Sequence, residues 1–364
     1  MIFFVAPSEE TWEFQDYLQT LGKELLGRIR ILTCDEIAAR QEVPLGSYIF
    51  VAIDQLSPTE KEIAAQCWEE LSKAQSDITL INHPAEVLLR YDLLKACFEL
   101  KRNSFRVRRA FEFLRCRNFP VFLRRDRDHN GSLTGLLYTQ RELARSVAKS
   151  LLQGYRLRDL IVVEYCDTLD PSGTFRKYSS FIVGDRVLPH TLMHSHNWIT
   201  KSLGRLIDAG TAHEELEYVQ SNPHAKWLRE TFELAKIHYG RIDYGLRDGE
   251  PQVWEINTNP TIIRTAGAGP ISEEQTRLRD PIRQHFFPNF QAALEAIDSV
   301  ADPSRAVRIK VSQRQQRRLA AEKRLGLRVK ARKTAISQIA NLLIWPLRRQ
   351  RDAISRLLKK SPDR

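Results

Sequence analysis

Cysteine is scarce in this sequence, and its five residues form no closely spaced pair. This spacing argues against a disulfide framework and against a zinc site built on Cys-x-x-Cys, so the cysteines are predicted to be reduced thiols in a cytoplasmic protein. The first seven residues, Met-Ile-Phe-Phe-Val-Ala-Pro, also lack the basic start and long apolar segment of a signal peptide. They are expected to form a first strand.

Acidic residues are scarce near the C-terminus. Residues 305–364 contain 19 of the 56 Lys and Arg residues but 3 of the 45 Asp and Glu residues. The net charge of +11 therefore belongs to a basic tail, and the body before it is slightly acidic. Such a body has little bulk charge with which to bind nucleic acid.

The basic tail, residues 304–364, contains one apolar patch, residues 336–347, which is interrupted by polar residues. The patch is shorter than the roughly 20 residues that span a bilayer. A basic, partly amphipathic helical tail suits peripheral contact with an anionic membrane, at the inner membrane surface, or with RNA. The alternative is a solvated tail or one that docks on the acidic body.

The remaining sequence has enough apolar residues, 42% of the whole, for a packed core. Residues 1–88 alternate apolar runs with helical patterns, which predicts an α/β domain with a mostly parallel sheet. Strands are expected at 2–5, 48–53 and 78–81, with a weaker one at 29–32, and helices at 10–26 and 59–73. Glycine-rich phosphate-binding motifs are absent from this segment, so by itself it indicates no ligand.

Carboxylates and amides are concentrated in one segment, residues 241–262. Arg-Asp-Gly-Glu, residues 247–250, predicts a hairpin turn that brings Asp243 beside Glu255. Along a strand, Glu255, Asn257 and Asn259 share one face, while Trp254 and Ile256 occupy the other. Two carboxylates and an amide oxygen are hard ligands suited to Mg²⁺. The alternative is a solvated acidic hairpin face.

This hairpin resembles the metal-binding hairpin of the ATP-grasp superfamily, whose members include D-alanine–D-alanine and glutamate-type ligases. The resemblance implies an ATP-grasp fold, α/β with an α+β core, preceded by a pre-ATP-grasp domain at 1–88. The ATP-grasp domain would occupy 89–303, with a lid sub-domain at about 105–165. Asp243, Glu255 and Asn257 would bind Mg²⁺, or Mn²⁺ in its place, and Arg241 would stabilise charge on the transferred phosphoryl group.

The same resemblance assigns basic residues to the phosphates of ATP. Arg124 ends a strand-like run, Asn118–Arg125, and stands where the family usually has lysine; its guanidinium can contact phosphate in a bidentate manner. Arg90, on a helix expected at about 85–101, and Lys177 are further candidates. For both, a solvated surface side chain is the alternative.

Nucleoside contacts are implied at the end of a buried strand, Asp159–Tyr165. Backbone groups near Glu164 and Cys166 would contact the purine, and Asp167 would bind ribose. Three histidines follow at 190, 194 and 196, but no further ligand at metal-site spacing accompanies them. A loop facing the substrate is therefore predicted at Ser195–Trp198.

The function implied by the resemblance is ATP- and Mg²⁺-dependent ligation of a small-molecule carboxylate to an amine, or to a thiol, through an acylphosphate. One alternative on the same fold is a kinase that phosphorylates a small-molecule hydroxyl. The other is a nucleotide-binding scaffold without catalysis, recruited by its basic tail. The sequence contains no Ser/His/Asp or Cys/His arrangement that would compete for the chemistry.

Overall fold

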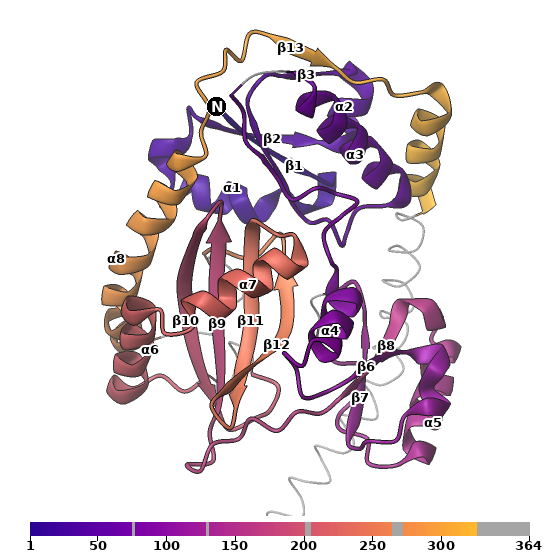
Figure 1. Cartoon of the computed structure of the whole chain (residues 1–364), viewed down its shortest axis with the longest axis vertical. Coiled ribbons are helices and arrows are strands. Elements are labelled where there is room, and N and C mark those ends of the chain that lie inside the picture. The colour runs from indigo at the N-terminus through magenta and orange to yellow at the C-terminus, as the bar shows by residue number, and fades with distance from the viewer. Residues whose placement is uncertain (75–76, 129–130, 201–204, 264–271, 326–364) are drawn as a thin grey trace, which may run out of the picture. The chain divides into compact units, whose positions relative to one another are not determined.

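The computed structural model describes residues 1–74, 77–128, 131–200, 205–263 and 272–325 (Figure 1). The chain divides into two compact units, Met1–Lys310 and Val311–Arg364. In the second unit residues 313–325 are helical, and the apolar patch of the predicted tail, residues 336–347, lies outside the described residues. No helix in the described ranges is both long and apolar enough to cross a membrane.

The first unit begins with a parallel four-stranded sheet in the order β2-β1-β4-β5, as the alternating pattern predicts. Its strands are β1 (Ile2–Ala6), β2 (Ile29–Thr33), β4 (Ser47–Phe50) and β5 (Leu80–Ile81). The helices that connect them are α1 (Trp12–Gln19), α2 (Cys34–Arg40) and α3 (Pro58–Ser72). Ser57 caps α3 with a capping box and Pro58 occupies its first turn, which explains why this helix starts where the sequence indicates.

Helix α1 is shorter than the helix predicted at residues 10–26. It ends at Gln19, and 3₁₀ turns lie on both sides of it, at Ser8–Glu10 and Lys23–Leu25. At Gly22 the chain passes so close to the Tyr17 ring that a Cβ atom would lie 2.6 Å from it. This tight return against Tyr17 stops the helix where the periodic pattern alone would continue it.

A second sheet is antiparallel, in the order β10-β9-β11-β12. Its strands are β9 (Phe175–Val183), β10 (Arg186–Ser195), β11 (Tyr239–Arg247) and β12 (Glu250–Asn257). Three helices belong to this part of the chain, α6 (Ala209–Ser221), α7 (Ala225–Ala235) and α8 (Glu273–Ala296). Helices α6 and α8 pack against each other and against β10 (Figure 1).

The third sheet is small and antiparallel, in the order β6-β8-β7, with β6 (Val107–Arg109), β7 (Val121–Arg125) and β8 (Leu160–Glu164). A 3₁₀ segment, Ala110–Arg115, a 3₁₀ turn, Leu157–Asp159, and α5 (Gln140–Leu152) accompany it, and α4 (Arg90–Glu99) precedes it and packs against β6 and β12. This part, which we call the lid (residues 105–165), has its own hydrophobic cluster.

Two short strands complete the first unit. β13 (Ala306–Arg308) pairs with β3 (Glu42–Pro44) in an antiparallel ladder. The first residues of the segment assigned to the basic tail thus form a two-stranded sheet with β3 within the first unit, and the second unit starts at Val311.

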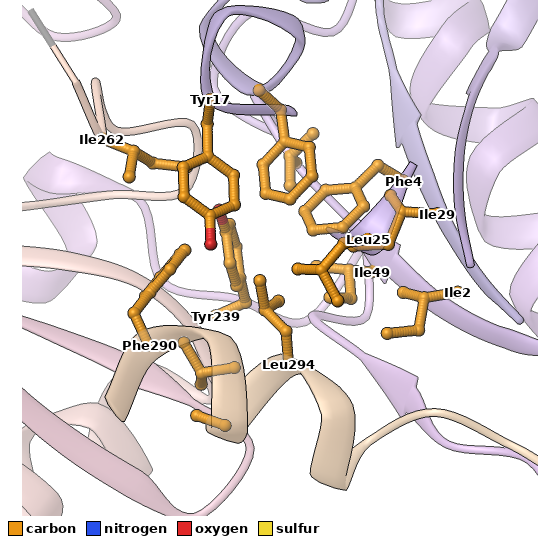
Figure 2. Packing of buried hydrophobic residues seen from close by; sticks show 14 of the residues in the cluster. Ile2, Phe4, Tyr17, Leu25, Ile29, Ile49, Tyr239, Ile262, Phe290 and Leu294 are labelled. Carbon is orange, nitrogen blue, oxygen red and sulfur yellow. The ribbon is translucent and has the colours of Figure 1, made fainter. Parts of the chain in front are cut away.

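One hydrophobic core joins the parallel and antiparallel sheets. Figure 2 shows side chains from β1, β2 and β4 in contact with others from α1, β11 and α8. At its centre Phe290 is fully buried, with its ring 5.4 Å from that of Tyr17 and 5.3 Å from that of Phe181. The N-terminal sheet therefore folds onto the antiparallel sheet through shared apolar burial.

A buried amide strengthens the same junction. Asn82, 1% exposed, donates from Nδ2 to the carbonyls of Phe50 (3.1 Å) and Tyr239 (2.7 Å). Its Oδ1 accepts from the backbone N–H groups of His238 (2.9 Å) and Tyr239 (3.1 Å). This side chain therefore joins the end of β4 to the start of β11.

The core predicts a large difference between two phenylalanines. Phe290→Ala should lower the free energy of unfolding by about 3–5 kcal/mol, because it removes a fully buried ring from a packed core. The matched control Phe111→Ala, whose ring is 59% exposed, should change it by about 0.5 kcal/mol or less. Urea unfolding of both variants measures the difference, and equal losses would show that Phe290 does not hold the core together.

Candidate functional site

The hairpin of β11 and β12 places the predicted metal ligands on one face. Its turn is Asp248-Gly249, and both residues have positive φ (53° and 83°), as a two-residue hairpin turn requires. Asp243 lies directly opposite Glu255, and Arg241 lies opposite Asn257. Directly opposed residues of an antiparallel pair project from the same face, so the predicted pairing of Asp243 with Glu255 is confirmed.

The orientation predicted for Trp254 is wrong. The register shifts between Asp243 and Tyr244, so that Tyr244 pairs with Val253 and Trp254 is the extra residue of a β-bulge. As a result Trp254 lines the same cavity as Glu255 and Asn257. Opposite this ring stands Gly245, where a Cβ atom would lie 2.8 Å from the indole.

Asp243 is buried, 5% exposed, and is held by two cations. Lys177 Nζ on β9 lies 2.9 Å from Oδ2, and Arg241 Nε lies 3.1 Å from Oδ1. Lys177 and Asp243 come from neighbouring strands of the antiparallel sheet. The structure thus brings Lys177, Arg241 and Asp243 together as the sequence predicts.

Glu255 is also held by two cations. Arg124 Nη2, from β7 of the lid, lies 3.2 Å from its Oε2, and Arg90 Nη2 contacts the same oxygen. Burial holds the pKa of Arg124 below its ordinary value. Arg90 acts in the same direction, whereas Glu255 acts to raise it. Two guanidinium groups from different elements therefore converge on one carboxylate.

Arg90 makes a further set of contacts. It is 6% exposed, and its Nη1 donates to the backbone carbonyls of Arg125 (3.3 Å), Asp126 (2.7 Å) and Asp128 (2.9 Å). Among the described residues, the Arg90 guanidinium therefore contacts the backbone of the loop after β7 through Nη1 and Glu255 through Nη2. Arg90 lies outside the residues that line either pocket described below.

The loop after β12 connects the hairpin to the N-terminal sheet. Asn257 Oδ1 accepts from the backbone N–H of Asn259 (2.8 Å), and Asn259 Nδ2 donates to the Glu10 carbonyl (3.0 Å). Thr261 Oγ1 donates to Glu13 Oε1 (2.9 Å), and the Thr261 carbonyl accepts from Arg241 (3.2 Å). The candidate metal ligands and the first helix thus share one hydrogen-bond network.

Glu13 is a site residue that the sequence analysis missed. It is 9% exposed, and its second oxygen, Oε2, is buried with no hydrogen-bond partner among the residues that the structure describes. Burial raises the pKa of Glu13 from 4.5 to about 7, although Thr261 and Arg241 act to lower it. One signal was available: Glu10 and Glu13 follow β1, and Asp54 follows β4, and ligands collect at the carboxyl ends of parallel strands.

Two pockets meet at this site. We call the first the apolar pocket: it is bounded by the lid, the linker after β8, and the antiparallel sheet. Its ring-bearing and aliphatic walls include Phe122, Val163, Tyr165, Trp198 and Trp254. The Trp198 ring lies 5.1 Å from Phe122 and 5.8 Å from Tyr165, so the loop predicted to face the substrate closes one side of this pocket.

The second, which we call the polar pocket, contains the hairpin ligands and the acidic residues of the N-terminal sheet. Its charged lining residues are Glu10, Glu13, Asp54, Arg124, Lys177, Arg241, Asp243 and Glu255. The two pockets share Arg124, Lys177 and Trp254 among their lining residues, so they adjoin one another. Cations lie where the pockets join, and the acidic wall lies on the N-terminal side.

Of the predicted nucleoside contacts, Glu164 and Cys166 line the apolar pocket. Glu164 Oε2 accepts from the Arg106 backbone N–H (3.0 Å), and the Cys166 thiol lies 3.5 Å from Ser104 Oγ. Asp167 lies outside both sets of lining residues; its Oδ1 accepts from Tyr165 Oη and the Leu169 backbone N–H, each at 3.0 Å.

The donor set at the hairpin fits Mg²⁺. Carboxylate oxygens of Asp243 and Glu255 face the polar pocket together with the Asn257 amide, and such oxygens are the ligands that Mg²⁺ prefers beside substrate phosphates. In the described ranges, by contrast, no three or more His, Cys, Asp or Glu side chains form a group that could hold a metal by themselves. An ion here would therefore depend on a ligand for its remaining contacts.

No family model matches this chain, and no curated protein matches it in sequence. Among solved structures it is similar to D-alanine–D-alanine ligase from Bacillus anthracis in complex with ATP (14% identity, TM-score 0.45, 80% of this chain and 97% of that one). It is similar to the ATP-grasp ligase PsnB (10%, 0.45, 78% and 99%) and to D-cycloserine synthetase DcsG (14%, 0.43, 81% and 99%).

The predicted resemblance to the ATP-grasp superfamily is thus matched by a likeness in structure across most of the chain. At these TM-scores the likeness carries no argument about activity. What the chain does is therefore inferred from the contacts within its own cavity.

Glu13 should make stability depend on pH. Its folded pKa of about 7 lies above the ordinary 4.5, so between these values the native state keeps a proton that the unfolded chain has lost. The stability present below pH 4.5 is therefore lost as pH rises through 7. Glu13→Gln removes this titration, so the variant should become more stable relative to the wild type from pH 5 to pH 8. Urea unfolding across this range tests it, and a difference independent of pH would contradict it.

Proposed function

We propose that this chain is an ATP-grasp enzyme that uses ATP and Mg²⁺ to join a carboxylate to an amine through an acylphosphate. The observation that carries the proposal is a pair of adjoining pockets with three chemically different walls: an aromatic wall, a cluster of cations around two carboxylates, and a buried acidic wall. The division into residues 1–88, 89–303 with a lid at about 105–165, and a basic tail from 304 is part of this proposal.

The apolar pocket suits the base of ATP. Its walls come from two sheets, with Phe122 and Val163 on the lid and Trp254 on the antiparallel sheet. A flat aromatic ligand between such walls buries both faces. Backbone groups at Glu164 and Cys166 border the same space and would contact the edge of the purine, and Asp167 would bind the ribose.

The junction of the pockets suits the phosphates. Arg124 and Lys177 line both pockets, so their charges lie between the base and the polar pocket. Arginine offers a bidentate fork and lysine a mobile point charge for phosphate oxygens. Arg90 would act on the phosphates indirectly, through the Glu255 carboxylate that it contacts.

Asp243, Glu255 and Asn257 would hold Mg²⁺, which when bound neutralises phosphate charge and polarises the transferred group. Arg241, which donates to Asp243 and to the Thr261 carbonyl, would stabilise negative charge on that group. The protein supplies positioning and electrostatics, because a phosphoryl transfer of this kind needs no protein nucleophile.

The acidic wall suits an amine. Glu13 Oε2 is buried and has no hydrogen-bond partner in the described part of the chain, so a substrate ammonium or amine N–H would satisfy it. Because its pKa is about 7, this carboxylate can also take a proton near neutral pH. Phosphate would be repelled from the same wall, so the amine substrate would lie towards Glu13 and the substrate carboxylate towards the cations.

The reaction would then follow in two steps. A substrate carboxylate oxygen attacks the γ-phosphorus of ATP, the bond to the β-phosphate bridge oxygen breaks, and ADP leaves. The amine nitrogen attacks the acyl carbon, the bond to the phosphate oxygen breaks, and phosphate leaves with the electron pair. The amine gives up its proton to the carboxylate of Glu13.

Of the alternatives, a hydroxyl kinase would use the same phosphate and metal groups, and Glu13 could serve it as the base for the hydroxyl, so the product distinguishes it from a ligase. A thiol acceptor would leave Glu13 Oε2 unsatisfied. A scaffold without catalysis would not require Asp243 and Glu255 to face one another across the hairpin. The acidic wall therefore favours an amine over a thiol acceptor.

Removal of one metal ligand should abolish turnover. Glu255→Ala should reduce ADP and phosphate release with ATP, Mg²⁺ and a mixture of amino acids by at least about 100-fold, because charge stabilisation at the phosphates is lost. The control Glu250→Ala changes an exposed carboxylate on the same strand and should retain activity. Circular dichroism checks the fold of both variants. Undiminished release by Glu255→Ala would refute the site, and phosphate retained on an acceptor would indicate a kinase.

Glu13 should determine use of the amine. Glu13→Gln should raise the KM for the amine by about 10–100-fold, the range expected when a buried charged contact worth about 1.5–3 kcal/mol is lost, and leave the KM for ATP within about twofold. Steady-state kinetics with each substrate varied in turn measures both constants. A rise in the KM for ATP alone would place Glu13 with the nucleotide instead.

A further inference from the structure

Each candidate metal carboxylate already has two cationic partners. Asp243 contacts Lys177 and Arg241, and Glu255 contacts Arg124 and Arg90. The carboxylate of Asp243 is buried, and that of Glu255 is largely shielded from solvent, 20% exposed. Four positive groups therefore surround two negative ones at the place where a divalent cation would bind.

This arrangement disfavours a metal ion by itself. A free Mg²⁺ would have to displace ion pairs from both carboxylates, and it would then lie among four like charges in a poorly solvated cavity. Repulsion between like charges a few ångströms apart is much larger there than in water. Mg²⁺ also gives up its water ligands reluctantly. Both effects oppose metal binding before any other ligand arrives.

A polyphosphate meets the opposite conditions. Its oxygens are acceptors for the guanidinium and ammonium groups, which can exchange the carboxylates for phosphate. Arg124, Lys177 and Arg241 line the cavity and are accessible to such a ligand, whereas Arg90 is anchored by three backbone carbonyls of the loop after β7. Exchange would therefore involve the three lining cations and leave Arg90 orienting Glu255.

The remaining charges of the cavity do not cancel this effect. Glu10, Glu13 and Asp54 line the N-terminal wall of the polar pocket, and burial raises the pKa of Glu13 to about 7, so that this acid is partly neutral near neutral pH. Among the described residues, the cations that contact Asp243 and Glu255 come from the antiparallel sheet (β9 and β11), from β7 of the lid and from helix α4, and none comes from the N-terminal wall.

We propose that the nucleotide binds before the metal: its phosphates take Arg124, Lys177 and Arg241 away from Asp243 and Glu255, and only then can these carboxylates hold a divalent cation. The inference rests on the proposed function, because it takes ATP as the polyphosphate. It adds an order of binding, in which Arg124, Lys177 and Arg241 contact the carboxylates of the metal site only until the nucleotide binds.

The first experiment uses the full chain and calorimetry in EDTA. ATP and inorganic triphosphate should each bind without metal, with a dissociation constant within about tenfold of that measured with Mg²⁺. Mn²⁺ alone, titrated without nucleotide into protein freed of EDTA, should show no saturable binding below about 1 mM. ATP binding that disappears in EDTA would overturn the order but leave the proposed function intact. No ATP binding in either buffer would overturn the proposed function and, with it, this inference.

The second experiment removes the competing cations. The double variant Arg124→Met, Lys177→Met frees one oxygen contact on each carboxylate, so Mn²⁺ alone should bind at least about tenfold more tightly than to the wild type. The matched control is Arg102→Met, which also removes a cation, but one paired with Glu230 away from the cavity; it should bind Mn²⁺ as the wild type does. Wild-type affinity equal to that of the double variant would overturn the proposal. If the double variant does not fold, the EDTA experiment decides alone.

Discussion

In the β11–β12 pair, Asp243 faces Glu255 directly across the ladder, and every other candidate group is placed by reference to that pair. Lys177 reaches Asp243 from the neighbouring strand, Arg124 reaches Glu255 from the lid, and Thr261 carries the network on to Glu13. A slip of one residue would turn Asp243 or Glu255 to the opposite face. The bulge at Trp254 adds an aromatic wall without disturbing that pairing.

The cavity separates charge by sheet. Cations from the lid and the antiparallel sheet surround the hairpin carboxylates, whereas the parallel sheet contributes acids at the ends of β1 and β4. Buried ion pairs are costly to break when one partner alone is removed, which explains why the hairpin carboxylates are kept paired. Glu13 differs from these two carboxylates, because burial favours its protonated, neutral form. A substrate with opposite charges at its two ends would match this division.

Local signals in the sequence determine much of this arrangement. Asp248-Gly249 defines the hairpin and hence the Asp243–Glu255 pair, and the alternating apolar runs define the parallel sheet. Other features depend on distant contacts that no local pattern contains. Tyr17 and Gly22 end α1 early, the register shift turns Trp254 round, and Glu13 becomes a site residue only because Thr261, 248 positions away, lies beside it.

The partners of each carboxylate are hidden for the same reason. From their positions along the chain, Arg90 and Arg124 are both predicted to contact the phosphates of ATP. Both contact Glu255, which lies 165 positions after Arg90 and 131 positions after Arg124 in the sequence. Burial and pairing at that range follow from tertiary packing, whereas chemical type and spacing follow from sequence.

The hydrophobic clusters are distributed unevenly around the cavity. The parallel and antiparallel sheets share one core, and Asn82 bonds to backbone groups on both sides of their junction. The lid packs around a separate cluster of its own. Moving the N-terminal sheet away would expose apolar surface and break those amide bonds, whereas moving the lid would chiefly separate polar contacts such as Arg124–Glu255. Displacing the lid would therefore cost less apolar burial than displacing the N-terminal sheet, which carries Glu13 and the acidic wall.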